Sequence, residues 1–476
     1  MRKIQHLALV SLLAFYVVPA TAADVTQTVR AAIRLPCQAT AGMNLKALAE
    51  RLPDARPRRS WVRYSRLGMV GWRMVFGVDG DELTVQFAGR PGSPDYVTAR
   101  YDAGKERRPL LLAIADASCT IHSARQLRYD QAGRPESLED LDSALRSTGE
   151  PEPLNPPVPA SHDPSGIAIG LADTGVNYLL PAIASRLARR PDGEILGYDY
   201  WDLDRRPFDA SPTPDPFFPS RHGTRTASLL LEEAPVAKLV PYRYPRHDMA
   251  RMTALIEDAA ARGVRVMNLS LVSRDRDEWL PFREAAEAHP GMLFVVAAGN
   301  HGRNVEEQPH YPAAFGLANM VVVTSATADG RLAEGVDWGP RSVDLMVHGE
   351  GVLALDFDGE RIPVFGSSYA TARATALAAC LLADHPEWSI AELKAAMFRE
   401  AQPSEPGQVA EGFVPDTALG NRGACGRQRL VCTAPGGACR ASGTAISLID
   451  PTRLGRTAPA SVACKDVGTG DLACSP

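Results

Sequence analysis

Short apolar segments alternate with helical segments from Gly166 onward, and this alternation constrains the fold more than any other feature. Three of the apolar segments have the length and continuous hydrophobic character of strands buried on both faces: GIAIGLAD, VRVMNLSL and MLFVVAAGN. Two of the stretches between them repeat apolar residues with helical spacing: HGTRTASLLLEEA and DMARMTALIEDAAARG. The alternation predicts βαβ units, so we expect residues 166–402 to form an α/β domain with a parallel β-sheet flanked by helices.

Residues 1–22 have the pattern of a secretory signal peptide. A basic start is followed by an apolar run and by the small-residue triplet Ala20-Thr21-Ala22, so cleavage is expected before Ala23. The alternative is an uncleaved membrane anchor, but the apolar run is short for a membrane span and a cleavage site follows it. We therefore expect a secreted or periplasmic protein that has no membrane attachment after signal cleavage.

Residues 23–150 have a mixed pattern that predicts a small N-terminal α+β domain. The segments WRMVFGV and ELTVQFA, joined through Asp79-Gly80, are expected to form a hairpin. The segment SLEDLDSALRS carries the capping-box residues Ser137 and Asp140, which predict the start of a helix. This domain contains no catalytic motif.

Eight cysteines agree with an oxidising compartment. Cys37 and Cys119 lie in the N-terminal domain, and five others lie in residues 403–476, a cysteine-rich C-terminal extension. The extension has neither a CxxC pair nor a histidine, so disulfides are predicted there rather than zinc. Because five is an odd number, one thiol of the extension is free or pairs elsewhere.

Residues 151–165 are proline-rich and predict a stiff, exposed linker.

Net charge gives no indication of a polyanionic partner. The formal charge is -5 at pH 7, so neither nucleic-acid binding nor anionic-membrane binding is expected. The sequence leaves the oligomeric state open.

Reactive side chains stand at the ends of elements of the predicted sheet. Asp173 follows the strand GIAIGLA directly, and Asn300 ends the strand MLFVVAAGN. His222 begins one helix, and Ser368, in FGSSYATARATALAA, begins another. Chemistry in open α/β sheets sits beyond the carboxyl ends of the strands, so we expect these side chains to meet. Together they supply a nucleophile, a base, a carboxylate that orients the base, and an amide for an oxyanion, which predicts nucleophilic acyl transfer.

Each of these residues also has a structural alternative. Asp173 and Asn300 could be turn residues, because small or turn-forming residues follow them. His222 could be a helix cap or a surface histidine, and Ser367 with Ser368 could cap a helix. The alternatives would have to hold together on one sheet and in this order, so the catalytic interpretation is favoured.

Five motifs resemble those of the subtilisin-like serine peptidases (subtilases), whose catalytic Asp, His and Ser follow each other in that order. In chain order they are DTGV, HGTRTAS, VVAAGN, YPAAF and GSSYATARATALAA. The likeness covers about residues 166–401 and is absent from the rest of the chain. It implies a serine-type endopeptidase that hydrolyses polypeptides through an acyl-enzyme intermediate. In that mechanism Asp173 orients His222, which acts as base and then acid, and Ser368 attacks. Asn300 and the Ser368 N–H stabilise the oxyanion.

The sequence departs from the subtilase pattern at several positions. Ser367 replaces a Thr, Tyr369 a Met and Ala372 the Pro that starts the nucleophile helix, while Ser228 replaces a Gly after the histidine. These changes are expected to weaken the rigidity of the helix start and close packing, but they remove no reacting group.

The segment NLSLVSRD resembles the part of a subtilase that binds substrate. The resemblance implies that a peptide pairs as an added strand along Ser270, Leu271 and Val272. Val272 and Ser273 stand where the family has glycines, so a narrower pocket is expected.

No cofactor is expected in the chemistry and no metal site is predicted. Family members often carry structural calcium, but no acidic loop identifies a site here, so calcium stays open.

Two other functions compete with this one. A related group, the serine-carboxyl peptidases, uses Glu in place of His, and the HGT motif at His222 argues against it. The chain could also be a catalytically silent peptide-binding protein on the same fold. The position of residues 23–150 suits either a removable prodomain or a permanent accessory domain.

Overall fold

The computed structural model describes residues 22–40, 43–64, 70–90 and 92–419, together with four short strands in the C-terminal extension. The chain divides into two compact units, Met1–Leu154 and Asn155–Pro476. Among the residues described, no helix is both long and apolar enough to cross a bilayer. The signal-peptide prediction falls on residues 1–22, of which 1–21 lie outside the described part.

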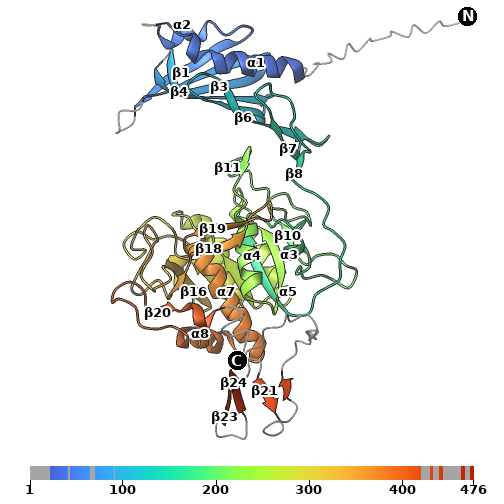
Figure 1. The fold of residues 1–476 in the computed structure, drawn as a ribbon, viewed down its shortest axis with the longest axis vertical. Coiled ribbons are helices and arrows are strands. Elements are labelled where there is room, and N and C mark those ends of the chain that lie inside the picture. Colours follow the sequence, from blue (N-terminus) through green and yellow to red (C-terminus); the bar gives the residue numbers. More distant parts are fainter. Residues whose placement is uncertain are drawn as a thin grey trace, which may run out of the picture. The chain divides into compact units, whose positions relative to one another are not determined.

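Eight antiparallel strands, each paired with the next along the chain, make up most of the first unit. Their bounds are β1 Arg56–Tyr64, β2 Val70–Val78, β3 Asp81–Arg90, β4 Ser93–Ala103, β5 Arg108–Ala115, β6 Ile121–Tyr129, β7 Pro135–Leu141 and β8 Glu152–Pro153. Helix α1 (Ala22–Arg34), the 3-10 turn η1 (Pro36–Gln38) and helix α2 (Leu45–Ala49) precede them (Figure 1). Val29 and Ile33 of α1 pack with Phe76 and Val85 of the sheet in one hydrophobic core.

The first unit contains the predicted hairpin, because β2 and β3 pair on either side of Asp79-Gly80. Gly80 has a φ of +98°, a conformation that glycine adopts without steric cost. Cys37 and Cys119 form a disulfide.

The predicted helix at SLEDLDSALRS is wrong. Ser137 and Asp140 lie in β7, which is paired between β6 and β8. Glu139 of this strand makes two hydrogen bonds, of 2.9 and 3.0 Å, with the guanidinium of Arg128 on β6. Pairing with neighbouring strands therefore outweighs the local capping signal. The N-terminal unit is mainly an antiparallel sheet, with less helix than an even α+β mixture.

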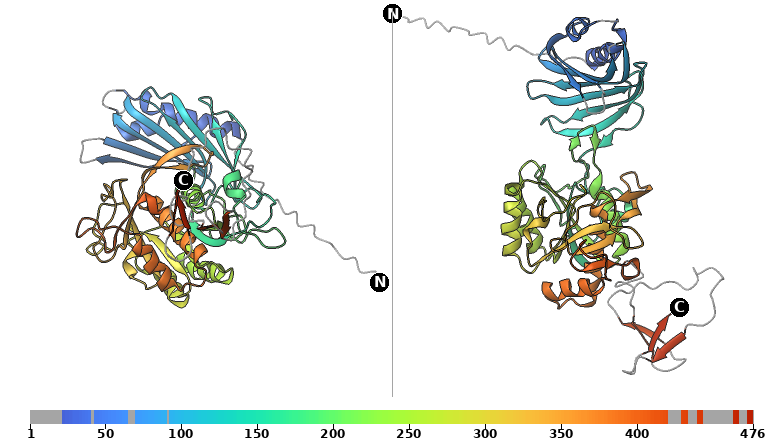
Figure 2. Two further views of the ribbon diagram at one scale, coloured as in Figure 1. Left: turned by 60° about the horizontal axis from the view of Figure 1, so that its bottom comes forward. Right: turned by 90° about the vertical axis from the view of Figure 1, so that its left-hand side faces the viewer.

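Eight parallel strands form the central sheet of the second unit, in the order β10-β13-β9-β14-β15-β16-β17-β20 (Figures 1 and 2). Their bounds are β9 Ile167–Asp173, β10 Tyr198–Asp199, β13 Ala237–Arg243, β14 Val266–Leu269, β15 Leu293–Ala297, β16 Met320–Ala326, β17 Leu345–His348 and β20 Gly412–Val414. Strands β14, β15 and β16 are buried along their whole length, as their continuous apolar sequence requires. The predicted parallel sheet is confirmed.

Helices connect these strands and cover both faces of the sheet. Their bounds are α3 Pro181–Ala184, α4 His222–Glu233, α5 Met252–Ala261, α6 Leu280–Ala288, α7 Ser367–Asp384 and α8 Ile390–Arg399. From β9 the chain moves to β13 on one side, and it then returns past β9 to β14 on the other side. Because parallel crossovers are right-handed, this reversal places α4 on the opposite face from α5 and α6. Helix α7 packs against α4 and runs along β14 to β17. The capping box predicted for α8, Ser389 with Glu392, is present.

Smaller elements complete the second unit. The 3-10 turns are η2 Met249–Arg251, η3 Asp277–Trp279, η4 Ala313–Phe315 and η5 Asp416–Ala418. Two antiparallel hairpins lie outside the central sheet, formed by β11 Pro214–Asp215 with β12 Phe218–Pro219 and by β18 Glu350–Leu355 with β19 Arg361–Phe365.

The proline-rich linker is fastened to the second unit over much of its length. The Asn155 side chain donates a hydrogen bond of 2.7 Å to Asp204, and the Tyr178 hydroxyl donates one of 2.6 Å to the carbonyl of Pro156. Pro156 is buried, whereas residues 160–162 are exposed. The expectation of an exposed linker therefore holds for residues 160–162 and fails at Pro156, whose carbonyl accepts a hydrogen bond from the buried Tyr178 hydroxyl.

The central sheet extends into the residues that the sequence analysis assigned to the C-terminal extension. Strand β20 pairs with β17 and closes one edge of the sheet, so the α/β unit continues beyond residue 402. Further on, two short antiparallel pairs are formed by β21 Arg429–Cys432 with β22 Cys439–Ser442 and by β23 Ala463–Asp466 with β24 Leu472–Ser475. The predicted disulfides and odd thiol of this extension lie outside the residues whose side chains are described.

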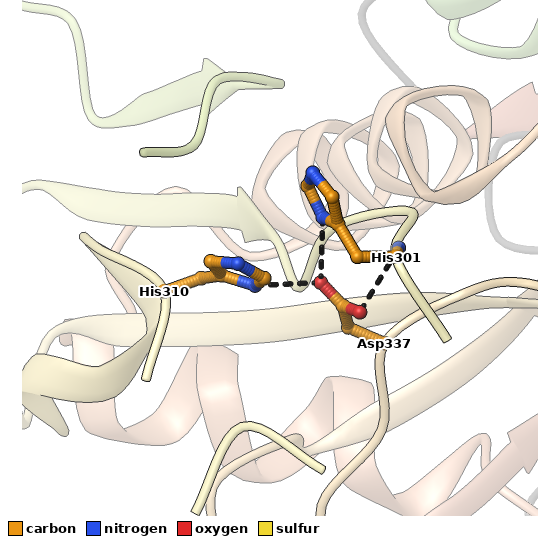
Figure 3. Close-up of side chains that lie close together, drawn as sticks. All are labelled: His301, His310 and Asp337. Carbon is orange, nitrogen blue, oxygen red and sulfur yellow. Dashed lines mark hydrogen bonds and ion pairs between the residues drawn. The ribbon is translucent and has the colours of Figure 1, made fainter. Parts of the chain in front are cut away.

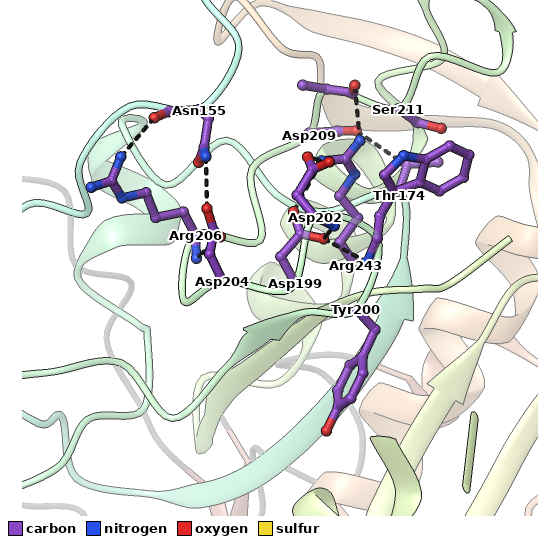
Figure 4. A network of polar contacts seen from close by, with 12 residues as sticks. Asn155, Thr174, Asp199, Tyr200, Asp202, Asp204, Arg206, Asp209, Ser211 and Arg243 are labelled. Carbon is purple, nitrogen blue, oxygen red and sulfur yellow. Dashed lines mark hydrogen bonds and ion pairs between the residues drawn. The ribbon is translucent and has the colours of Figure 1, made fainter. Parts of the chain in front are cut away.

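A buried carboxylate, that of Asp209, links the end of β9 to the start of α4. Asp209 is fully buried, and its Oδ1 accepts a 2.6 Å hydrogen bond from the Thr174 hydroxyl. Its Oδ2 accepts from both the N–H and the hydroxyl of Thr224, at 2.8 and 2.6 Å. Burial raises the pKa of Asp209 to about 6, although the three hydrogen bonds act in the opposite direction. Nearby, Arg243 forms a buried ion pair with Asp199 at 2.9 Å (Figure 4).

Removing the Asp209 carboxylate should destabilise the second unit. In Asp209→Ala the three donors on Thr174 and Thr224 lose their acceptor, and each unsatisfied buried group costs about 1–3 kcal/mol. We expect the free energy of unfolding, measured by urea denaturation, to fall by at least about 3 kcal/mol. Asp209→Asn, which keeps one acceptor oxygen, should lose less.

A matched control is Asp215→Ala in the β11–β12 hairpin. Asp215 accepts one turn hydrogen bond, from the Phe217 N–H at 2.9 Å, so its loss should cost no more than about 1.5 kcal/mol. Equal effects of the two alanine variants would contradict the assignment of Asp209 as the link between β9 and α4.

Candidate active site

The candidate residues gather where the strand order reverses direction. Strand β9 leads to β13 on one side, and β14 lies on its other side, so a crevice opens beyond the carboxyl ends of β9 and β14. Asp173 is the last residue of β9, and Ser270 directly follows β14. The topology alone therefore brings the predicted acid and the start of the predicted substrate segment to one place.

Asp173 and His222 form the central polar contact of this crevice. His222 Nδ1 lies 2.7 and 2.9 Å from the two carboxylate oxygens of Asp173. Asp173 is fully buried, and it also accepts hydrogen bonds from the Thr174 N–H at 2.7 Å and from the Thr226 hydroxyl at 3.1 Å. Because Nδ1 faces the carboxylate, it carries the proton in the neutral ring, and Nε2 is left as the basic nitrogen. Gly223 allows this approach, since a Cβ there would collide with the Gly175 carbonyl.

The surroundings of His222 favour its charged form. Burial of the ring acts to lower the pKa of His222, but the charge of Asp173 and its hydrogen bond outweigh burial, so the pKa is raised above the ordinary value of 6.5. Arg225 opposes this increase, and Asp209 adds to it. His222 is thus a stronger base than a free imidazole.

Ser368 lies in the first turn of α7, but it does not cap the helix. The residue before the helix is Gly366, with a φ of +114° and no capping side chain. Ser367 is fully buried, and its hydroxyl accepts a 3.3 Å hydrogen bond from the Gly299 N–H. The Ser368 carbonyl accepts a 3.1 Å bond from the Ser270 hydroxyl. The capping interpretation of the two serines is therefore wrong, since backbone geometry at the glycine starts this helix.

Ser368 makes no direct hydrogen bond with His222. The ring of Tyr369, the next residue, lies 5.8 Å from the His222 imidazole between centroids. Between these two described residues the structure has no hydrogen bond from the Ser368 hydroxyl to His222 Nε2. Such bonds are often long in unliganded sites and shorten when substrate binds.

Asn300 is joined to the start of α7. Its Oδ1 accepts a 2.9 Å hydrogen bond from the Ser367 N–H, which leaves the amide Nδ2 pointing elsewhere. A Cβ on Gly366 would lie only 3.0 Å from this Oδ1, so glycine is required for the contact. Asn300 is exposed, and its amide donor can therefore meet a ligand from solvent.

A pocket of about 330 Å³ contains both the Asp173–His222 pair and the predicted substrate segment. Ser270, Leu271 and Val272 line one side of it. Leu271 and Val272 form no backbone hydrogen bonds with other described residues. Their free N–H and C=O groups can pair with an extended peptide. Five of the seven predicted site residues thus line this pocket. Ser368 is attached to it through the Ser270 hydroxyl, and Asn300 is attached to Ser367.

Sequence reasoning missed several residues of this region. Asp209 was not identified because it follows no strand and belongs to no motif, and its partners Thr174 and Thr224 come from separate elements. Thr213 and Pro214, at the start of the β11–β12 hairpin, line the pocket, as does Arg246 after β13. The segment with Thr213 and Pro214, DASPTPDPFFPS, is distinguished in the sequence only by its acidic, proline-rich composition. Composition alone does not place a residue in a site.

The sequence matches a family model described as "Subtilase family" over residues 164–423, more than half of its 476 residues. The thermophilic serine proteinase of Bacillus sp. (strain AK1) is 27% identical over 232 residues, which cover 46% of this chain and 52% of that protein. Halolysin of Haloferax mediterranei is 28% identical over 235 residues, 46% of this chain and 42% of that protein. The chain spans about half the length of these curated relatives.

A solved structure of a cold adapted subtilisin-like serine proteinase aligns with 55% of this chain and 94% of its own, at 20% identity and a TM-score of 0.44. Another, of MycP1 with the N-terminal propeptide removed, aligns with 53% of this chain and 90% of its own, at 21% identity and a TM-score of 0.41. The family match alone covers more than half of the sequence, and it includes every predicted site residue. This chain belongs to the subtilase family.

Proposed function

We propose that this protein is an exported serine endopeptidase that uses Asp173, His222 and Ser368. The observation that carries the proposal is the 2.7 Å contact of His222 Nδ1 with buried Asp173, in a pocket shared with Ser270–Val272. That contact leaves Nε2 as a base for the serine in the first turn of α7. Export rests on the signal-peptide pattern of residues 1–22, and N-terminal sequencing of the exported protein should begin at Ala23.

The proposed reaction has two halves. His222 Nε2 takes the proton of the Ser368 hydroxyl while Oγ attacks the peptide carbonyl carbon, and Asp173 stabilises the imidazolium. The carbonyl oxygen becomes an oxyanion that accepts hydrogen bonds from Asn300 Nδ2 and from the Ser368 N–H. His222 then gives its proton to the amine as the C–N bond breaks, which leaves an acyl-enzyme. A water molecule, deprotonated by His222, releases the acid by the same steps. No cofactor takes part, and we propose no role for calcium.

Labelling with a fluorophosphonate tests this proposal against a catalytically silent protein. The reagent phosphonylates only an activated serine, so the full chain should be labelled at Ser368, identified by peptide mass. Ser368→Ala and His222→Ala should not be labelled. Ser367→Ala is the matched control, because it removes the neighbouring hydroxyl and should still be labelled. A folded wild type that takes up no label, even after removal of residues 23–150, would contradict the proposed peptidase function.

Activity should increase with pH as His222 loses its proton. The imidazole must be neutral to accept the Ser368 proton, and the Asp173 carboxylate raises the pKa of His222 above 6.5. Hydrolysis and fluorophosphonate labelling should therefore be low at pH 5.5 and reach half of their maximum above pH 6.5. Rates measured from pH 5 to 9 on folded protein check this, and a flat profile over that range contradicts the role of His222 as base.

Substitution of Asn300 should reduce turnover more than substrate binding. Loss of one preorganised oxyanion donor costs about 100- to 1,000-fold in kcat, so Asn300→Ala should lose that much with KM nearly unchanged. Asn300→Asp separates the donor from the structural contact, because it keeps an acceptor for the Ser367 N–H but has no Nδ2. It should be at least as impaired as the alanine variant. Recovery of activity in Asn300→Asp would mean that only the contact with Ser367 matters.

We expect Val272 to restrict which substrate side chains are accepted at the residue that precedes the cleaved bond. We propose that a polypeptide substrate adds a strand along Ser270–Val272, and the two valine methyls reduce the space beside it. Small or slender side chains should be cleaved faster than Phe or Tyr in a peptide library. Val272→Gly should raise kcat/KM for the aromatic peptides. A strong preference of the wild type for Phe or Tyr at that position contradicts this role of Val272.

A further inference from the structure

Two histidines from one connection and an aspartate from the next converge beside the candidate active site (Figure 3). His301 lies in the loop after β15, directly after Asn300, and His310 lies farther along the same connection. Asp337 comes from the connection between β16 and β17. Each side chain offers one ligand atom, and these atoms all lie within 4.8 Å of one another. The two connections meet only in the folded chain, so no metal-ligand spacing is recognisable in the sequence.

Asp337 is the fixed centre of this cluster. It is fully buried, and its Oδ1 accepts the backbone N–H groups of His301 and Arg303, both at 3.0 Å. Its Oδ2 faces the two imidazoles, 2.7 Å from His310 Nδ1 and 3.3 Å from His301 Nδ1. Gly299 leaves room for it, since a Cβ there would collide with this oxygen. The carboxylate is therefore oriented by the backbone, with one oxygen directed at the pair of rings.

His310 has an unsatisfied nitrogen that points into the cluster. The residue is 1% exposed, and within the described part of the chain its Nδ1 has no hydrogen-bond partner. The 2.7 Å distance to Asp337 is short, but the direction of the ring N–H misses the carboxylate oxygen. A buried polar atom without a partner is costly, and its presence in a native site indicates an unseen water or ion.

We propose that His301, His310 and Asp337 bind a divalent transition-metal ion, with Zn²⁺ the best fit. Two neutral imidazoles and one carboxylate are ligands that zinc accepts, and three protein ligands with one open position are typical of open zinc sites. The His301 side chain is 45% exposed, so water can occupy the fourth position. Ca²⁺ and Mg²⁺ prefer sets of oxygen ligands and suit this cluster poorly.

Arg274 competes with the metal for His310. Its Nε donates a 3.4 Å hydrogen bond to His310 Nε2, which keeps the ring proton on Nδ1. A metal at Nδ1 requires that proton to sit on Nε2 instead, so Arg274 must move away. Arg274 is exposed and follows Ser273, whose backbone pairs with Tyr311 next to His310, so its side chain can leave without disturbing the loops. Removing the guanidinium should therefore tighten metal binding.

The site is placed to fix the loop that carries Asn300. His301 and Asn300 are adjacent, so a metal that holds the His301 ring against Asp337 also restrains the neighbouring amide. This consequence rests on the proposed peptidase function, but metal binding itself does not. The two are separated by measuring binding on a protein that cannot turn over substrate.

Zinc titration of full-length Ser368→Ala protein, followed by calorimetry and by competition with a chromogenic chelator, tests the site. We expect one ion bound with a dissociation constant of about 10 µM or lower, and Co²⁺ substitution should give the intense visible bands of a four-coordinate ion. Added Zn²⁺ should also raise Tm, because a ligand of the native state stabilises it by mass action. No binding below 100 µM, or weak bands typical of six-coordinate Co²⁺, would overturn the proposal.

His301→Asn in the same background should weaken binding about 100-fold, because even outer-shell partners of metal sites contribute 10- to 100-fold. His385→Asn is the matched control. Like His301, His385 is half-exposed, 46%, with a carboxylate 3.4 Å from its Nδ1, but no second histidine is grouped with it. The His385→Asn variant should bind Zn²⁺ with the same dissociation constant as the Ser368→Ala parent. Arg274→Gln should bind more tightly than the parent. Equal binding by the His301 and His385 variants, or weaker binding by Arg274→Gln, contradicts the site.

Discussion

The contact between the end of β9 and the start of α4 is the constraint on which the site depends. Asp173 and His222 are far apart in sequence, and a buried carboxylate in contact with a histidine is stable only if both backbones are held closely. Gly223 against Gly175 provides the close approach, and Asp209 links the residues that follow Asp173 and His222. These polar contacts therefore hold Asp173 and His222 at hydrogen-bonding distance. They do so beside the crevice that the order of the strands creates at the edge of the sheet.

Most of the α/β unit could be predicted because its strands are apolar along their whole length and its helices are amphipathic. The closeness of Asp173 and His222 could be expected for a related reason, since the residues that follow the strands of a parallel sheet meet at one edge. The helix prediction for SLEDLDSALRS was wrong because a local capping rule takes no account of the pairing of Glu139 with Arg128 across β6 and β7. Asp209 and the cluster around Asp337 could not be identified from the sequence, because their partners come from segments that meet only in the complete fold.

Three departures from the subtilase pattern have structural roles in this chain. The Ser228 hydroxyl accepts from the Leu355 N–H at 2.9 Å and donates to the Arg225 carbonyl at 2.9 Å, so it joins α4 to β18 where a glycine could not. Tyr369 is buried beside His222 and limits the freedom of its ring. Ala372 is also fully buried, within the packed part of α7.

The fastening of Pro156 to the second unit changes what a break in the linker would release. Residues 160–162 are the exposed stretch, yet Asn155 and Pro156, on the N-terminal side of it, are held by Asp204 and Tyr178. A cut within that stretch would leave Asn155 and Pro156 as a short tail on the N-terminal fragment, still hydrogen-bonded to the rest of the second unit. Separation of the two fragments would then be governed by dissociation of this tail rather than by the cut itself, so the nicked protein would behave as a non-covalent complex with its own lifetime.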